Sequence, residues 1–192
     1  EFSQFEGYDP SVVARKEVEL LRCADVVFAS SEELALTKRH HRGDVHLVRH
    51  GVEYDHFAQA WRAPWPCPTE LADLDAPIFG FFGLIQHWVD VELIAAAARL
   101  RPRYAFVLLG ETRTDVSPLQ ALPNVRLLGR RPYSDLPAYC ARFSAGLLPF
   151  KRNELTRNVN PIKLREYLAA GLPVISTPLP EVERYAPHAR II

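Results

Sequence analysis

The chain has 192 residues, 48% of them hydrophobic, and its 23 Lys and Arg residues balance its 23 Asp and Glu residues. This is an ordinary globular composition, and a formal net charge of zero gives no electrostatic basis for binding nucleic acid. No apolar run approaches the roughly 20 residues that a membrane-spanning helix needs. The cysteines Cys23, Cys67 and Cys140 lie far apart without metal-ligand spacing, which favours a reducing, cytoplasmic location.

The first 57 residues show an alternation of helical and strand patterns. Ser11 is positioned to cap one helix, and Ser31 precedes a second helix whose first turn is acidic, as the helix dipole favours. The order strand, helix, strand implies a parallel sheet. We interpret residues 1–57 as the C-terminal remnant of an N-terminal domain. The predicted elements are a helix at 10–22, a strand at 24–29, a helix at 32–42 and a strand at 45–48.

Residues 58–75 lack a clear periodic pattern. This stretch contains three prolines together with Trp61 and Trp65, and proline at such a density interrupts helices and strands. We therefore predict an interdomain linker over these residues, rather than a helix or a strand. The chain has no Met and ends in a strand-like run at 189–192, so we expect it to be part of a longer protein.

From residue 76 to residue 192, apolar strands alternate regularly with helical patterns. Alternation of this kind produces a doubly wound parallel sheet, in which ligands bind at the carboxyl ends of the strands. The predicted fold class is therefore α/β and Rossmann-like, preceded by the remnant of another domain. The predicted strands are 77–83, 104–110, 124–129, 145–148 and 173–176, with helices at 89–100, 134–142 and 161–170.

The stretch from residue 158 to residue 176 carries the most informative pattern. Pro161 suits the first turn of a helix, and Gly171 suits the position just beyond its end. Lys163 and Glu166 are three residues apart and so share one face of that helix. A helix N-terminus attracts anions, and a carboxylate accepts hydrogen bonds from a sugar diol. The stretch therefore has the groups needed to hold a nucleotide.

This stretch resembles the signature segment of retaining glycosyltransferases with the GT-B fold, of the group 1 (family four) type. The resemblance implies that residues 76–192 form the nucleotide-sugar donor-binding domain and that residues 1–57 come from the acceptor-side domain. It assigns Glu166 to the ribose of the donor. Two positions depart from the family's pattern. Asn158 stands where the family has a Glu that contacts the donor sugar, and Pro161 stands where a Gly usually offers its N–H to the diphosphate.

The resemblance extends to two earlier segments. Gly83, at the end of a predicted strand, matches the glycine that lets the donor diphosphate approach the backbone. The basic residues that follow this glycine in the family are not matched, so the phosphates need cations from elsewhere, and we favour Lys163. Arg130 follows an Asn-Val-x-x-x-Gly run that lies beside the nucleobase in the family. An exposed arginine without a ligand role is an equally good interpretation of Arg130.

By this resemblance the reaction transfers a sugar from a nucleoside-diphosphate donor to an acceptor hydroxyl, with retention. We expect no cofactor and no bound metal. The acceptor is a glycan, a lipid-linked molecule or a small molecule, bound largely by the missing N-terminal domain, and the inner face of the membrane is an alternative location. A nucleotide-sugar-binding module without catalysis and a nucleotide-sugar epimerase of the same architecture stay open. The catalytic candidates are Asn158 and Lys163, and the donor-binding candidates are Gly83, Arg130, Asn160, Lys163, Leu164 and Glu166.

Overall fold

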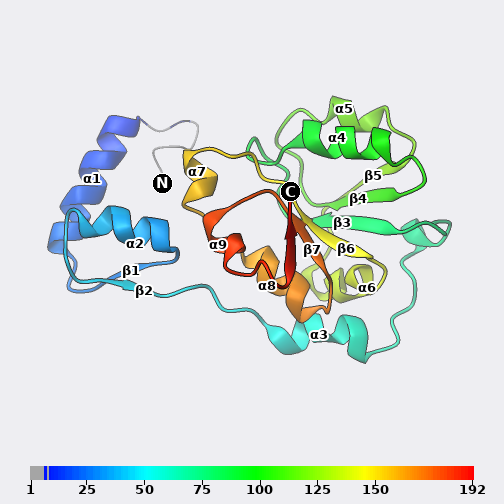
Figure 1. Cartoon of the computed structure of the whole chain (residues 1–192), viewed down its shortest axis with the longest axis horizontal. Coiled ribbons are helices and arrows are strands. Elements are labelled where there is room, and N and C mark those ends of the chain that lie inside the picture. The colour runs from blue at the N-terminus through cyan, green and yellow to red at the C-terminus, as the bar shows by residue number, and fades with distance from the viewer. Residues whose placement is uncertain (1–6, 8) are drawn as a thin grey trace.

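The computed structural model describes residue 7 and residues 9–192. It contains a small two-stranded unit near the N-terminus and a larger α/β unit (Figure 1). The larger unit is built on a six-stranded sheet in which every neighbouring pair of strands is parallel. In spatial order these strands are β5 (Val125–Gly129), β4 (Ala105–Leu109), β3 (Ile78–Phe82), β6 (Ala145–Leu148), β7 (Val174–Ser176) and β8 (Ala189–Ile191).

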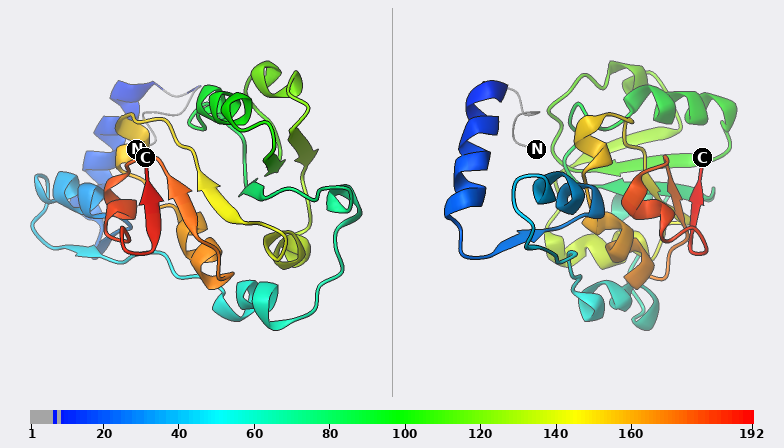
Figure 2. Two further views of the ribbon diagram at one scale, coloured as in Figure 1. Left: turned by 45° about the vertical axis from the view of Figure 1, so that its right-hand side comes forward. Right: turned by 60° about the vertical axis from the view of Figure 1, so that its left-hand side comes forward.

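This order is that of a doubly wound sheet. Numbered from its own first strand it reads 3-2-1-4-5-6, so the chain starts at the centre, runs to one edge and returns to fill the other. One face carries α4 (Val91–Leu100) and α5 (Ser117–Gln120), and the other carries α3 (Tyr54–Arg62), α6 (Leu136–Cys140) and α8 (Ile162–Ala169) (Figure 1, Figure 2). Two short helices, α7 (Glu154–Arg157) and α9 (Pro180–Glu183), follow β6 and β7. The predicted α/β, Rossmann-like fold class is confirmed.

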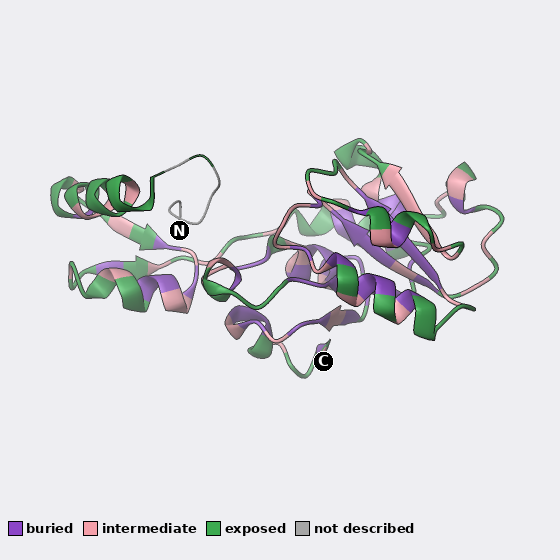
Figure 3. Cartoon of the chain, turned by 90° about the horizontal axis from the view of Figure 1, so that it is seen from above, coloured by how far each residue is buried: buried purple, intermediate pink, exposed green. Residues whose placement is uncertain are grey.

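The large sheet forms the main hydrophobic core. All five residues of β4 are buried, and their sequence is a continuous apolar run, as expected for a strand that helices cover on both faces. Figure 3 shows the strands of this sheet as mostly buried, whereas α1 (Pro10–Cys23), in the N-terminal unit, is mostly exposed. Among the helices that the structure describes, none combines the length and the apolar character needed to cross a bilayer.

Helix α8 packs very closely on the central strand β6. Gly146 of β6 lies against the Tyr167 ring, and a Cβ atom at this glycine would lie only 2.4 Å from that ring. Tyr167 is fully buried, and its hydroxyl accepts a hydrogen bond of 3.2 Å from the Phe82 N–H. Gly171, with φ of +72°, ends the helix as predicted. Because α8 follows a strand of a parallel sheet, its N-terminus lies at the carboxyl edge of the sheet.

The N-terminal unit consists of α1 followed by one β-α-β element. Its strands β1 (Val27–Ala29) and β2 (Val45–Leu47) are parallel, as predicted, and α2 (Glu32–Arg39) connects them. Ser31 caps α2, as expected, by accepting a hydrogen bond from Leu34 N–H. The predicted cap of α1 is wrong: Asp9 accepts the N–H hydrogen bonds there, because its carboxylate reaches both Ser11 and Val12.

The prediction of a non-periodic linker over 58–75 is wrong at both of its ends. Helix α3 extends to Arg62 and packs on α6 and α8, with Ala58 fully buried and the Trp61 indole N–H donating to the Ala169 carbonyl at 3.1 Å. A 3₁₀ helix, Thr69–Leu71, buries Leu71 completely. The three prolines lie between these two helical elements. They therefore prevent helix only over the residues between the elements, and not over the whole of 58–75. The division into domains at residues 57 and 76 stays a prediction.

Candidate functional site

Three segments meet where the strand order of the large sheet reverses, between β3 and β6. The loop that begins at Gly83 follows β3, the segment at Phe150 follows β6, and the N-terminus of α8 lies beside both. The connections after β3 and β6 lead to opposite faces of the sheet, which opens a crevice at the carboxyl ends of these strands. Doubly wound proteins bind their ligands in this crevice.

Lys163 of α8 lies directly over the turn at Gly83. Gly83 has φ of +131°, and a Cβ atom placed on it would lie 2.1 Å from Cε and 2.6 Å from Nζ of the lysine. Glycine is therefore required for two reasons, the backbone conformation and the space that Lys163 occupies. The ammonium group makes no hydrogen bond or ion pair within the described part of the chain. Burial lowers the pKa of Lys163, and the Glu166 carboxylate partly offsets this shift.

Glu166 lies one turn further along the same face of α8. Only 7% of the residue is exposed, yet its carboxylate has no hydrogen-bond or ion-pair partner among the described residues. Burial raises the pKa of Glu166; Lys163 opposes that shift, and the negative charge of Glu53 adds to it. A buried carboxylate without partners is costly. Glu166 is not a lining residue of either pocket beside Gly83, but its oxygens receive no hydrogen bond from the described residues.

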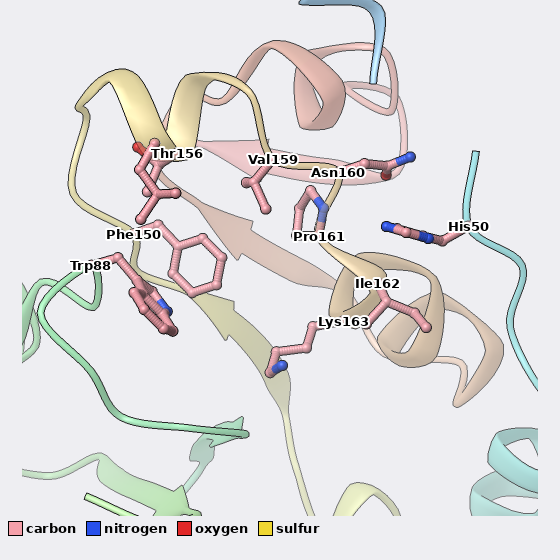
Figure 4. A pocket seen from close by; sticks show the side chains of 10 residues that line it. His50, Trp88, Phe150, Thr156, Val159, Asn160, Pro161, Ile162 and Lys163 are labelled. Atoms are coloured by element: carbon pink, nitrogen blue, oxygen red, sulfur yellow. The ribbon is translucent and has the colours of Figure 1, made fainter. Parts of the chain in front are cut away.

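One pocket is lined by Gly83 and a second by Lys163, so each borders one side of the contact between these two residues. The first, of about 440 Å³, lies over the ends of β3, β4 and β5. The second, of about 340 Å³, extends toward α7 and the N-terminus of α8 (Figure 4). The first pocket is lined by Phe82, Gly83, Leu84, Leu109, Gly110, Glu111, Arg113, Arg130, Arg131, Tyr133 and Leu136. The second is lined by His50, Trp88, Phe150, Leu155, Thr156, Val159, Asn160, Pro161, Ile162 and Lys163.

The other predicted site residues lie at different distances from this centre. Arg130 is exposed and lines the first pocket. Asn160 lines the second pocket, but its amide is already bonded: it donates to the Ser30 carbonyl at 2.6 Å and accepts from Arg165 at 2.6 Å. The Leu164 side chain is 1% exposed and belongs to the core, so only its backbone is able to contact a ligand.

Asn158 lies outside both pockets. Its amide nitrogen donates to the Glu154 carbonyl at 2.8 Å, which closes the end of α7, and its own carbonyl accepts from the Ser31 hydroxyl at 2.6 Å. The Asn158 side chain is therefore bonded within α7 and does not line the pocket that Lys163 lines. The basic residues at 151, 152 and 157 also line neither pocket, and Arg157 is paired with Glu33 at 2.9 Å.

Of the lining residues of the second pocket, only Asn160 and Lys163 were predicted site residues, and three of the others come from segments before α7: His50, Trp88 and Phe150. Figure 4 shows them around the N-terminus of α8, although they come from the segment after β2, the loop after β3 and the segment after β6. Each follows a predicted strand, which is the one signal that the sequence offers for them. The adjacency of β3 and β6 brings Trp88 and Phe150 together, and a hydrophobic pattern does not reveal strand order.

Buried polar contacts join the N-terminal unit to the large unit close to this crevice. Glu181, which is 1% exposed, accepts hydrogen bonds from the Glu32 N–H at 2.7 Å and from Arg49 Nε at 2.8 Å. Burial alone raises the pKa of Glu181, but these hydrogen bonds outweigh it and hold the pKa below its usual value. The start of α2 is thereby anchored on α9 and on the loop that leads to α8.

Comparison with known proteins agrees with this geometry. Residues 76–190 match the family model of the glycosyl transferases group 1. TuaH of Bacillus subtilis, a glycosyltransferase provisionally assigned to teichuronic acid biosynthesis, is 33% identical over 181 residues, which cover 90% of this chain and 45% of TuaH.

Solved structures share the fold at low sequence identity. HepE of Anabaena, in complex with UDP-glucose, has a TM-score of 0.69 at 15% identity and covers 100% of this chain and 56% of its own. Sucrose-phosphate synthase of Thermosynechococcus elongatus has a TM-score of 0.69 at 18% identity, with 100% and 50% covered. This chain therefore spans about half the length of its relatives. The family match and the similarity to TuaH together show that the chain belongs to the glycosyl transferases group 1.

Proposed function

We propose that this chain is the donor-binding part of a glycosyltransferase that transfers a sugar from a nucleoside-diphosphate donor to an acceptor hydroxyl, with retention. The observation that carries the proposal is the position of Lys163, which lines one pocket, over Gly83, which lines another, with the unpartnered Glu166 one turn away. A nucleoside-diphosphate sugar has the matching order of parts: a base, a ribose diol, a double anion and a sugar. HepE, which shares the fold, binds UDP-glucose.

Each part of the donor has a counterpart in the site. The base would lie in the first pocket beside Arg130 and Tyr133, and the ribose diol would donate to Glu166. The diphosphate would lie at Gly83, close to the N-terminus of α8 and to the ammonium of Lys163. The sugar would then enter the second pocket. Binding of the dianion would also favour the charged form of Lys163, whose pKa burial lowers.

In the proposed reaction the bond between the anomeric carbon and the diphosphate oxygen breaks, the acceptor oxygen forms the new bond to that carbon, and the proton of the acceptor hydroxyl passes to the departing diphosphate. Negative charge grows on the departing diphosphate as the bond breaks. Lys163 and the N-terminus of α8 would stabilise this charge without having to reorganise. These groups would supply the positive charge that a bound metal ion could otherwise supply, so we expect the reaction to require no bound metal.

Calorimetric titration with UDP, GDP and ADP tests donor binding. We expect one nucleotide to bind and Lys163→Met to weaken it about 10- to 100-fold, because a hydrogen bond to a charged group contributes about 1.5–3 kcal/mol. The exposed Lys151 provides a matched control variant, Lys151→Met, which should bind normally. Glu166→Gln should weaken UDP but not its 2′,3′-dideoxy analogue, which lacks the diol. If Glu166→Gln weakened both ligands equally, the ribose assignment would be wrong.

A nucleotide-sugar-binding module without catalysis is the second candidate. The observation in its favour is that the Asn158 amide is bonded to the Glu154 carbonyl and does not reach the pocket assigned to the sugar. The two functions differ in the fate of the donor. Incubation of the chain with a radiolabelled nucleotide sugar should release free nucleoside diphosphate if the site is catalytic, and should return the donor intact if it only binds.

A further inference from the structure

Helix α8 carries Lys163 in its first turn, yet the start of this helix has no side-chain cap. Pro161 occupies the cap position and makes no side-chain hydrogen bond to the helix. The first N–H groups of a helix have no partner within it, so an uncapped first turn frays easily. The contact with Gly83 is nevertheless very close, because a Cβ atom at this glycine would lie 2.1 Å from Cε of Lys163. Another contact must therefore hold this turn in place.

The Asn160 amide, one residue before the cap position, supplies this support. Its oxygen accepts a hydrogen bond of 2.6 Å from Arg165 of α8, and its nitrogen donates one of 2.6 Å to the Ser30 carbonyl, in the N-terminal unit. Asn160 is 3% exposed, so the loss of either bond would leave a buried polar group unpaired. Figure 4 shows the Asn160 and Lys163 side chains leaving the turn in opposite directions. Asn160 therefore connects α8 to the N-terminal unit.

A second contact holds the same turn against the N-terminal unit. The Ser31 hydroxyl donates to the Asn158 carbonyl at 2.6 Å, and its oxygen also accepts from the Leu34 N–H as the cap of α2. Ser31 is fully buried and is not a lining residue of either pocket beside Gly83. The segment between β1 and α2 therefore holds residues 158–160 at two points, immediately before α8 begins.

We propose that Asn160 is a positioning residue, which fixes the first turn of α8 so that Lys163 reaches the donor diphosphate. Because Asn160 and the neighbouring Asn158 are bonded to Ser30 and Ser31, the position of this turn depends on the N-terminal unit. The junction between the two units thus contributes to donor affinity without touching the donor. This role differs from direct binding of the donor by Asn160, whose amide is already bonded at both ends. The inference rests on the proposed donor-binding function.

A double-mutant cycle with Lys163 tests the positioning role. Asn160→Ala removes both hydrogen bonds, and in calorimetric titration it should weaken UDP binding about three- to tenfold, because the lysine is kept but is less well fixed. When Lys163→Met is already present, Asn160→Ala should change the affinity by less than about twofold, since no ammonium is left to position. A general loss of folded protein would reduce binding equally in both backgrounds. GDP or ADP replaces UDP if it is the nucleotide that binds.

Two further variants test the link to the N-terminal unit. Asn160→Asp keeps an acceptor for Arg165 but no longer donates to the Ser30 carbonyl, so it should weaken UDP by a factor similar to that of Asn160→Ala. Ser31→Ala removes the second contact and should weaken UDP about two- to fivefold. Thr37→Ala is the matched control, because the Thr37 hydroxyl donates to a carbonyl within α2, and it should leave the UDP affinity unchanged.

The outcomes separate the inference from the function it rests on. Equal losses from Asn160→Ala with and without Lys163→Met would overturn the inference and leave the proposed function standing. Normal UDP affinity in Asn160→Asp and Ser31→Ala would overturn it too, because the N-terminal unit would then not position the lysine. If Asn160→Ala does not fold, Ser31→Ala with and without Lys163→Met provides the same cycle. Failure of UDP, GDP and ADP to bind the unmodified chain would reject both the inference and the proposed function.

Discussion

Two buried glutamates, fifteen positions apart in sequence, show the difference between the crevice of this protein and the junction between its two units. Glu181 at the junction accepts hydrogen bonds from Arg49 and from the Glu32 N–H, and its pKa lies below the usual value. Glu166 in the crevice has no such partner among the described residues, and burial raises its pKa. The same side chain is satisfied in one place and left unsatisfied in the other.

The contrast indicates that the charge of Glu181 stabilises the fold, whereas the charge of Glu166 is suited to binding a ligand. A buried carboxylate with complete hydrogen bonds stabilises the fold together with its partners. Removal of the carboxylate leaves those partners buried and unpaired, which lowers the free energy of unfolding. A buried carboxylate without partners opposes folding, and it is expected where a ligand supplies the missing donors. The two sites should therefore respond in opposite directions to the same substitution.

The largest expected effect is at the junction. Glu181→Ala leaves the Arg49 guanidinium and the first N–H of α2 without their acceptor, and it should lower the free energy of unfolding by about 3 kcal/mol. We take the lower end of the range for broken buried pairs because the Arg49 side chain is 31% exposed. Urea unfolding measures this loss. Glu183→Ala, at an exposed neighbour on α9, is the control and should change stability little.

The next effect is at Gly83, where the crevice depends on the absence of a side chain. Gly83→Ala places a methyl group against Cε of Lys163 in a backbone conformation that alanine avoids, and it should destabilise the fold by about 2 kcal/mol. The displaced lysine should also weaken UDP binding about tenfold or more. Gly43→Ala is the control, since nothing lies within 4 Å of a Cβ atom there. If Gly83→Ala bound UDP with normal affinity, the proposal that Lys163 contacts the diphosphate would be wrong.

The smallest effect on stability is expected at Glu166 and should have the opposite sign to that at Glu181. Glu166→Gln removes a desolvated negative charge that has no partner, so the free energy of unfolding at neutral pH should stay the same or rise by up to about 1 kcal/mol. The loss of the ion attraction to Lys163 limits the gain. Urea unfolding of this variant beside Glu181→Gln makes the comparison direct. A large loss of stability in Glu166→Gln would show that its carboxylate supports the fold.

Much of this arrangement follows from local sequence patterns. The sequence predicts the apolar strands β3, β4 and β6 and the helix between Pro161 and Gly171. These elements are predictable because hydrophobic periodicity, and the ends that proline and glycine impose, depend only on residues close together in sequence. Lys163 and Glu166 share a face for the same reason. Helix α3 was missed because the prolines that follow it dominate the pattern, while its burial depends on contacts with α6 and α8.

The rest of the site depends on relations between distant residues. That β3 lies next to β6 decides that Trp88 and Phe150 line one pocket, and no local pattern encodes it. The direction of the Asn158 amide is set by the Glu154 carbonyl, which competes with any ligand for it. The family resemblance placed Asn158 by its position in a motif, whereas the hydrogen bond shows what the side chain does. Tertiary hydrogen bonding is what the sequence alone does not supply.

Acid titration tests the difference between the two glutamates in a second way. The folded-state pKa of Glu166 is raised, so its penalty is present at high pH and disappears as pH falls through that pKa toward the unfolded value of about 4.3. The pKa of Glu181 is lowered, so its contribution is complete above about 4.3 and is lost only as pH falls through the folded pKa. The free energy of unfolding should be measured from pH 8 down to pH 3. As pH falls, the stability gained by Glu166→Gln should disappear at a higher pH than the stability lost by Glu181→Gln. If both differences shrank over the same pH range, the two carboxylates would not differ in the way their partners indicate.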